Sequence, residues 1–373
     1  MKRANILIKP VSARCNMACS YCFYSDLASR FPTLEIMKED EIPLLVDWLF
    51  SSLTPSSFLS ITFQGGEPTL IGLSFYKRFV SEVERKNKKN IRVTFSLQTN
   101  GYNITEEWAL FFKEKNFLLG VSLDGSEELH NRYRLDKLGN KSFSRVLEGI
   151  RILERYGVVY NVLSVITHST EPLSWYRFFK RNGIRHLQFI PCLDNLGESN
   201  SGEYSLKVED YTKFLVAVFP LWLRDWRNGN YISIRFFEEI INKVLKSDNV
   251  SCSLTGECGK YLVLEADGTL YPCDFFVLEE WKIGKYKEYE NYEEALNSTL
   301  MQHFISSHSK ENEDCFSCKW KDLCNGGCPR YRSDNNAIYC TSYKEFFTFA
   351  YDEILECAEK EKRFRAFYRQ KKY

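Results

Sequence analysis

The strongest constraint on the fold is a regular alternation of short apolar runs and amphipathic segments in the first half of the chain. The apolar runs, typical of strands, are 5–9, 58–63, 91–97, 118–123, 158–166 and 186–192. The helical segments between them are 38–52, 74–86, 105–115, 143–156 and 172–182. Strands that alternate with helices predict an α/β fold with a parallel sheet. Six units are too few for a closed eight-stranded barrel, so we expect an open or partial barrel.

The second half of the chain has a different character. A β-hairpin is predicted over 261–272, because Asp267 and Gly268 supply the positive φ angles of a two-residue turn. Helices are predicted over 211–227, 234–246, 293–306 and 343–367. The predicted domains are a core (1–230), a cysteine-rich domain (231–350), and a C-terminal helix with a basic, solvated tail (351–373).

Thirteen cysteines are many for a chain whose first residues do not resemble a secretory signal. Eleven of them fall in two clusters, and only Cys192 and Cys357 stand apart. We expect a cytoplasmic protein without a membrane span, in which such clusters indicate metal or redox chemistry rather than disulfides. The net charge of +1 gives no basic field for binding nucleic acid.

The first cluster, Cys15, Cys19 and Cys22, forms a CxxxCxxC motif directly after the first predicted strand. Three thiolates do not complete a structural zinc site, which prefers four protein ligands. Three are the right number for a [4Fe–4S] cluster with one iron left open for a small molecule. Zinc with a remote fourth ligand remains the alternative interpretation of this motif.

A second motif follows the second predicted strand, where Gly65 and Gly66 precede Glu67 and Pro68. Two glycines at the end of a strand let a ligand approach the backbone closely. Alone, the motif could be an ordinary strand-to-helix turn. Its pairing with CxxxCxxC after the preceding strand is far more specific.

Together, the two motifs resemble those of radical S-adenosylmethionine (SAM) enzymes. The resemblance implies a partial (β/α)6 barrel and a [4Fe–4S] cluster on Cys15, Cys19 and Cys22. It also places Tyr21 near the adenine of SAM and the turn of Gly65, Gly66 and Glu67 near its methionine moiety.

Eight further cysteines lie between residues 252 and 340, which is enough for two complete sets of four. Zinc ribbons are the alternative on spacing alone. Next to a radical SAM core, the pattern resembles a SPASM domain with two auxiliary [4Fe–4S] clusters. The resemblance implies one set of Cys252, Cys258, Cys273 and Cys328, and another of Cys315, Cys318, Cys324 and Cys340.

Further segments resemble those of anaerobic sulfatase-maturating enzymes; they are 8–10, 22–24, 63–70, 96–101, 122–125, 187–190, 233–236, 271–275 and 343–347. The resemblance implies that a 5′-deoxyadenosyl radical abstracts a Cβ hydrogen from a Cys or Ser of an unfolded sulfatase. Loss of a proton and an electron then leads to Cα-formylglycine, with an auxiliary cluster as electron acceptor. A flavodoxin or ferredoxin is the implied external electron donor.

The same resemblance assigns individual residues. Asp274 corresponds to the catalytic base, although a lone carboxylate at the end of a hairpin is usually exposed. Gln64, Ser122 and Leu193 correspond to SAM contacts, and Tyr24 and Arg235 to substrate contacts.

Two other functions are compatible with the sequence. Ribosomal-peptide maturases that form thioether or carbon–carbon crosslinks share the radical SAM and SPASM architecture. A zinc-binding interaction protein would use the clustered cysteines for structure alone.

The metal content tests these interpretations. Eleven cysteines divided as three, four and four predict about 12 irons per chain after anaerobic reconstitution. A colourless preparation with near-stoichiometric zinc would instead support the interaction protein. About four irons, with zinc at the other sites, would rule out the two auxiliary clusters only.

Overall fold

The computed structural model describes residues 1–24, 35–194, 202–309, 312–333 and 336–370. The chain divides into two compact units, each discontinuous in sequence. Unit one comprises Met1–Leu123, Glu127–Leu163 and Gly259–Ser307. Unit two comprises Asp124–Ser126, Ser164–Cys258 and His308–Tyr373.

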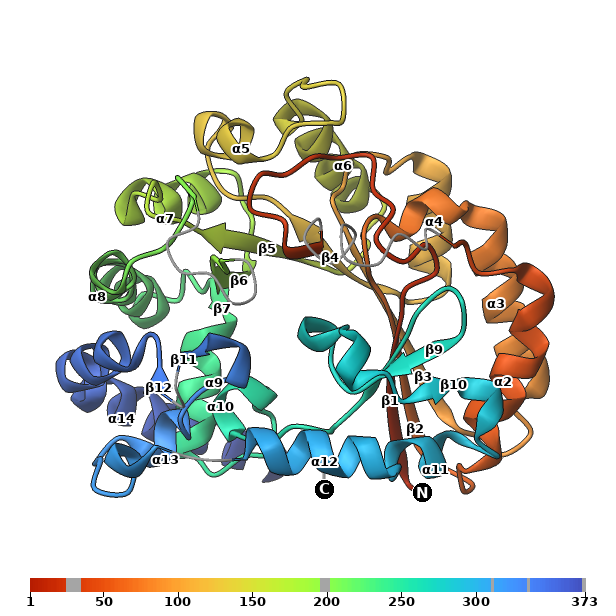
Figure 1. The fold of residues 1–373 in the computed structure, drawn as a ribbon. Coiled ribbons are helices and arrows are strands. Elements are labelled where there is room, and N and C mark those ends of the chain that lie inside the picture. Colours follow the sequence, from red (N-terminus) through yellow and green to blue (C-terminus); the bar gives the residue numbers. More distant parts are fainter. Residues whose placement is uncertain (25–34, 195–201, 310–311, 334–335, 371–373) are drawn as a thin grey trace. The chain divides into compact units, whose positions relative to one another are not determined.

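Unit one is built on a sheet whose strands follow the order β10-β9-β8-β1-β2-β3-β4-β5 (Figure 1). The parallel strands are β1 (Arg3–Ile8), β2 (Phe58–Phe63), β3 (Arg92–Thr99), β4 (Leu118–Ser122) and the start of β5 (Tyr160–Ile166). The hairpin of β8 (Leu262–Leu264) and β9 (Thr269–Tyr271) joins this sheet through β8, which runs parallel to β1. The two-residue β10 (Gly284–Lys285) pairs with β9.

The helices of unit one cover the sheet because their apolar residues recur on one face. They are α2 (Ile42–Ser51), α3 (Leu73–Lys86), α4 (Glu106–Glu114), α5 (Glu127–Tyr133), α6 (Phe143–Arg155), α11 (Tyr292–Leu296) and α12 (Thr299–His308). Tyr76 and Phe79 of α3, for example, place their rings 5.0 and 5.3 Å from the fully buried ring of Phe63 in β2. Such contacts fix the strand ends from which the candidate site is built.

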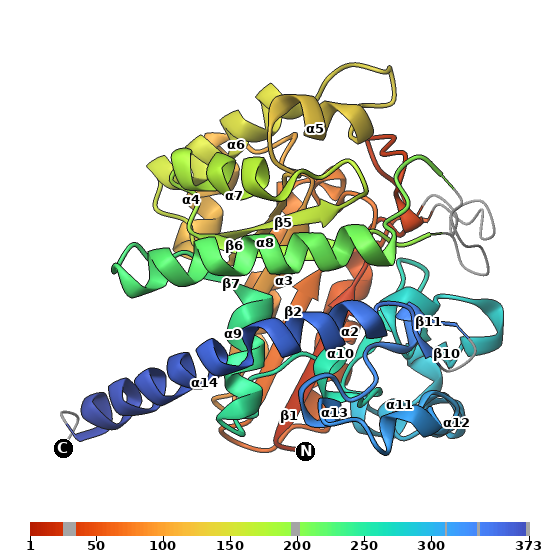
Figure 2. The same cartoon turned by 90° about the vertical axis from the view of Figure 1, so that its left-hand side faces the viewer.

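Unit two contains the end of β5, β6 (His186–Pro191) and the short β7 (Ser233–Ile234). Its helices are α7 (Pro172–Arg181), α8 (Val208–Arg227), α9 (Arg235–Val244), α10 (Cys252–Thr255), α13 (Lys321–Cys324) and α14 (Cys340–Gln370). Helices α8 and α14 pack side by side (Figure 2). A two-stranded hairpin, β11 (Arg332–Ser333) and β12 (Asn336–Ala337), precedes α14.

All six predicted strands of the alternating region are present, and so is the predicted hairpin, which confirms the α/β class. The single helix predicted over 293–306 is wrong, because α11 ends at Leu296 and α12 begins at Thr299. Asn297 leaves the helical conformation, and the Ser298 hydroxyl accepts from Met301 N at 3.3 Å, which starts a new helix. None of the described helices is long and apolar enough to cross a membrane.

Candidate functional site

The segment with Cys15, Cys19 and Cys22, called the cysteine loop here (residues 9–24), follows β1 and is fixed on two sides. On one side, Gly66 N and Glu67 N donate to the carbonyls of Ser12 and Arg14, each at 2.8 Å. On the other, Ala18 N and Ser20 N donate to the carbonyls of Leu135 and Tyr133, each at 2.9 Å. The side chains of all three cysteines are half-buried.

The two glycines after β2 allow the cysteine loop to lie this close. A Cβ atom on Gly66 would lie 2.1 Å from the Arg14 carbonyl oxygen. Gly65 has a φ angle of 119°, and its Cβ would lie 2.6 Å from the Ser12 carbonyl oxygen. Glycine is therefore required at both positions by the neighbouring backbone, and at Gly65 also by its own φ angle.

Glu67 ties this turn to the end of β3. Its Oε1 accepts from Thr69 N at 3.0 Å, the Thr69 hydroxyl at 2.6 Å and the Thr99 hydroxyl at 2.8 Å. Its Oε2 accepts from Asn100 N at 2.7 Å. Burial raises the pKa of Glu67 above its usual value, and these hydrogen bonds oppose the shift. The carboxylate is thus engaged by donors of the chain itself.

The surroundings of Cys15 suit a thiolate that binds iron. Its sulfur accepts from Met17 N at 3.4 Å and from Asn100 Nδ2 at 3.7 Å. Burial raises the pKa of the Cys15 thiol, while these donors lower it. Hydrogen bonds to cysteine sulfur are a usual feature of iron–sulfur sites. The donor set therefore fits a cluster held by the cysteine loop.

Tyr21 lies in the same loop, and its hydroxyl accepts from Arg134 Nη1 at 3.1 Å. Arg134 is only 6% exposed, so a guanidinium group is buried beside the cysteine loop. Arg134 is not among the residues that sequence reasoning selected. It lies between predicted elements, and backbone pairing of residues 133–136 with the cysteine loop brings it there.

Asp274 is buried, at 5% exposure, and is not the exposed hairpin residue that a lone carboxylate would usually be. Its Oδ2 accepts from the Tyr24 hydroxyl at 2.5 Å and from Gln64 Nε2 at 3.0 Å. Its Oδ1 faces Lys9 Nζ at 2.7 Å as an ion pair. Three residues that the sequence assigned to different roles, Tyr24, Gln64 and Asp274, are therefore in mutual contact in unit one.

Lys9 is the residue of this cluster that sequence reasoning missed. It is 1% exposed, and its ammonium group also pairs with Glu265 Oε1 at 3.0 Å. Burial lowers the pKa of Lys9, but the carboxylates of Asp274 and Glu265 outweigh burial and raise it above its usual value. The sequence did contain a signal for this role, because Lys9 stands at the end of a predicted buried strand. A lysine in the protein interior needs charged partners, so its position indicated nearby carboxylates.

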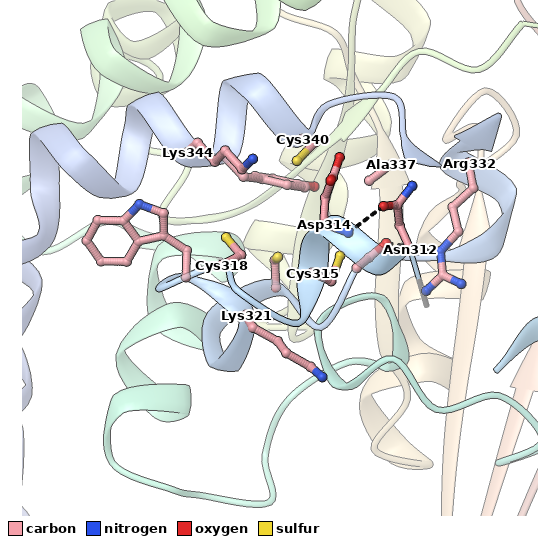
Figure 3. A pocket seen from close by; sticks show the side chains of 13 residues that line it. Asn312, Asp314, Cys315, Cys318, Lys321, Arg332, Ala337, Cys340 and Lys344 are labelled. Atoms are coloured by element: carbon pink, nitrogen blue, oxygen red, sulfur yellow. Dashed lines mark hydrogen bonds between the residues drawn. The ribbon is translucent and has the colours of Figure 1, made fainter. Parts of the chain in front are cut away.

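Unit two holds a pocket lined by Cys315, Cys318, Cys324 and Cys340, the second set that the resemblance implies. Figure 3 shows the sulfur atoms of three of them, Cys315, Cys318 and Cys340, turned toward the same space. Tyr343 and Lys344, which lie about one turn after Cys340 in α14, also line it. Four thiolates with a common pocket can hold a cluster.

The other auxiliary cysteines are distributed between the units. Burial raises the pKa of Cys328 in unit two to about 12, and Cys252 and Cys258 add to the shift. Cys273 belongs to unit one, where its sulfur lies 3.4 Å from the Tyr261 hydroxyl. Among the described residues, no three His, Cys, Asp or Glu side chains surround a single-ion position.

The remaining predicted residues lie at element ends. Ser122 ends β4 in unit one, and Leu193 follows β6 in unit two. Arg235 begins α9 in unit two, where it donates to Glu239 Oε1 at 2.7 Å and to Gln188 Oε1 at 3.2 Å.

Comparisons with known proteins agree with this geometry. Residues 10–173 match the radical SAM superfamily, and residues 256–319 match an iron–sulfur cluster-binding domain, SPASM. The chain is 42% identical to the cysteine-type anaerobic sulfatase-maturating enzyme of Clostridium novyi, over 93% of this chain and 95% of that one. It is 30% identical to the serine-type enzyme of Bacteroides thetaiotaomicron, over 92% and 88%.

The fold also matches a solved structure of native anSMEcpe with bound AdoMet and Cp18Cys peptide. The TM-score is 0.90 at 38% identity, and the match covers 96% of this chain and 99% of that chain. These findings confirm a radical SAM domain combined with a SPASM domain, and with them SAM and [4Fe–4S] clusters as the cofactors. The domain boundaries at 230 and 350 stay predictions.

The packing of Gly66 against the cysteine loop yields a testable prediction. Gly66→Ala places a methyl group against the Arg14 carbonyl, so the loop must shift. The reconstituted variant should bind about four fewer irons per chain than the unmodified protein, measured by colorimetric iron assay. Gly183→Ala is the control for backbone strain alone, because its φ angle of 73° disfavours alanine while nothing lies within 4 Å of the added Cβ, and it should keep its iron. Full iron content in Gly66→Ala would show that the loop tolerates the methyl group.

Proposed function

Because this chain belongs to the radical SAM superfamily and, within it, to the anaerobic sulfatase-maturating enzymes, we propose that it oxidises a side chain of an unfolded sulfatase to Cα-formylglycine. The 42% identity to a cysteine-type enzyme favours cysteine as the oxidised residue over serine. The observation that carries the proposal is the buried cluster of Lys9, Tyr24, Gln64 and Asp274, which presents a carboxylate near the cysteine loop within unit one.

In the cysteine loop, Cys15, Cys19 and Cys22 would hold the [4Fe–4S] cluster. That cluster and SAM together supply a carbon radical able to remove a hydrogen atom from a substrate Cβ. The residues that would contact bound SAM are Tyr21, Gln64, Gly65, Gly66, Glu67, Ser122 and Leu193. Since all four hydrogen bonds to the Glu67 carboxylate come from the chain, its contribution is to shape the turn. The buried guanidinium group of Arg134 is of the type that binds a ligand carboxylate through charge-assisted hydrogen bonds.

Asp274 is the base. Conversion of a cysteine to a thioaldehyde removes one hydrogen atom from Cβ, one proton from sulfur and one electron. The proton goes to the Asp274 carboxylate, and a bound auxiliary cluster would supply the electron acceptor. Water then replaces sulfur as hydrogen sulfide to give the aldehyde. Asp274 directly follows Cys273, a proposed cluster ligand, so the chain positions the base and a ligand together.

Lys9 is a positioning residue in this scheme. Its ammonium group compensates the buried charge of Asp274, and Glu265 in turn compensates Lys9. Tyr24 and Gln64 donate hydrogen bonds to Asp274 Oδ2, while Lys9 pairs with Oδ1. Contacts to both oxygens fix the orientation of the Asp274 carboxylate. We assign Tyr24 and Arg235 to the substrate pocket, and a flavodoxin or ferredoxin in the cytoplasm to the supply of electrons.

The peptide-crosslinking alternative has less support, because relatives at 30–42% identity over most of the chain are sulfatase-maturating enzymes. Anaerobic turnover with SAM, a reductant and a Cys-x-Pro-x-Arg peptide, followed by mass spectrometry, separates the two. Formylglycine formation from cysteine exchanges sulfur for oxygen and also removes two hydrogens, whereas a crosslink removes two hydrogens and keeps the sulfur. A product that has lost two hydrogens but kept its sulfur would contradict the proposal.

The role of Asp274 is tested by Asp274→Asn, which keeps the shape of the side chain but cannot take a proton. The variant should keep its iron and its SAM cleavage, while formylglycine yield falls at least about a hundredfold. Deuterium from a Cβ-labelled peptide should still reach 5′-deoxyadenosine, because hydrogen abstraction precedes proton removal. Product formation at a near-normal rate would exclude Asp274 as the base, and parallel loss of iron would make its role structural.

A further inference from the structure

Asn100, which follows β3, has no role in the function proposed above, yet its side chain reaches the cysteine loop. Asn100 is 6% exposed. Its Nδ2 donates to Asn16 Oδ1 at 2.7 Å and to Cys15 Sγ at 3.7 Å. Its Oδ1 accepts from Tyr102 N at 2.9 Å. Because both ends of the amide are engaged, its N–H groups are held toward the cysteine loop.

The backbone of Asn100 is fixed by the glycine-containing turn after β2. Asn100 N donates to Glu67 Oε2 at 2.7 Å, and Glu67 N donates to the Arg14 carbonyl at 2.8 Å. Glu67 therefore anchors both the residue that precedes Cys15 and the residue whose side chain reaches Cys15. The position of the Asn100 amide relative to the sulfur is built into the packing of these strand ends.

Two donors approach the Cys15 sulfur, and they differ in origin. The donor at 3.4 Å is the backbone N–H of Met17, which any residue except proline would supply. The donor at 3.7 Å is the Asn100 amide, which depends on that side chain. Hydrogen bonds to the sulfurs are among the determinants of the reduction potential of an iron–sulfur cluster.

We infer that Asn100 is a positioning residue that raises the reduction potential of the cluster on the cysteine loop by donating a hydrogen bond to Cys15. The inference rests on the ligation proposed above. One-electron reduction adds negative charge to the cluster and its thiolates, so a donor at the sulfur stabilises the reduced form more than the oxidised form. The electron comes from the external donor, and no proton is transferred.

Two variants test this inference. Asn100→Ala removes the whole amide, whereas Asn100→Asp keeps an oxygen that can accept from Tyr102 N and removes the donor. The midpoint potential is measured by redox titration of the full reconstituted protein, following the electron paramagnetic resonance signal that SAM alters. We expect the equilibrium constant for reduction to fall about tenfold in Asn100→Ala, which corresponds to about 59 mV toward more negative potential. In Asn100→Asp it should fall at least as far, because the carboxylate also places a negative charge beside the sulfur.

Asn87→Ala is the matched control. Asn87 also bridges a turn, through two hydrogen bonds of 2.8 Å with Ile91, but it lies at the opposite end of β3. Its loss should leave the potential unchanged. An unchanged potential in both Asn100 variants at full iron content would overturn the inference, even if turnover falls. Loss of the cluster from both would also overturn it, because the role of Asn100 would then be structural.

Failure of the proposed function has a different signature. If Cys15, Cys19 and Cys22 are not the ligands, their joint replacement by alanine leaves the SAM-sensitive signal in place. If the reaction is not formylglycine formation, the unmodified protein fails in turnover. Neither outcome depends on the potentials of the Asn100 variants.

Discussion

The arrangement of the proposed site depends on the ion pairs that the buried ammonium group of Lys9 forms. Lys9 directly follows β1, and it pairs with Asp274 and Glu265, which flank the strands of a hairpin more than 250 residues later in the chain. The backbone reinforces this contact, because Lys9 N donates to the Leu264 carbonyl at 2.8 Å and β8 runs parallel to β1. Loss of one member of a buried charged group leaves the others uncompensated, which is strongly destabilising. The charge of Lys9 therefore couples the hairpin, and the base on it, to the first strand of the sheet.

The parallel sheet of unit one brings the remaining groups to the same place. The cysteine loop, Gln64 and Asn100 follow β1, β2 and β3, and the carboxyl ends of neighbouring parallel strands lie together. Gly65 and Gly66 allow the segments after β1 and β2 to touch, and Glu67 joins them to the end of β3. The cluster site and the proposed base thus share one framework of backbone contacts.

Much of this arrangement could be predicted from the sequence because its signals are local. Short apolar runs alternating with amphipathic segments predicted the six strands, and the spacing of Cys15, Cys19 and Cys22 predicted the cluster site. The partners of Asp274 could not be predicted in this way, since Lys9 is an ordinary basic residue until a distant hairpin places two carboxylates beside it. Arg134 and Asn100 were missed for the same reason, as each meets the cysteine loop only through tertiary pairing. The helix break at Asn297 depends on Ser298, whose hydroxyl accepts a hydrogen bond from Met301 N at the start of α12. A single serine is a weak signal within an otherwise helical pattern.

The most direct test of this account is the coupling ratio of Lys9→Met, defined as formylglycine formed per SAM cleaved, with iron content measured in parallel. Methionine keeps much of the length and volume of lysine but removes the charge that holds Asp274. The account predicts a lower unfolding temperature, because two buried carboxylates lose their counter-charge. In the protein that stays folded it predicts unchanged iron and continued SAM cleavage, with the coupling ratio lowered about a hundredfold because the base is no longer held in place. A ratio equal to that of the unmodified protein, at full iron content, would contradict the claim that the buried ammonium group positions the base.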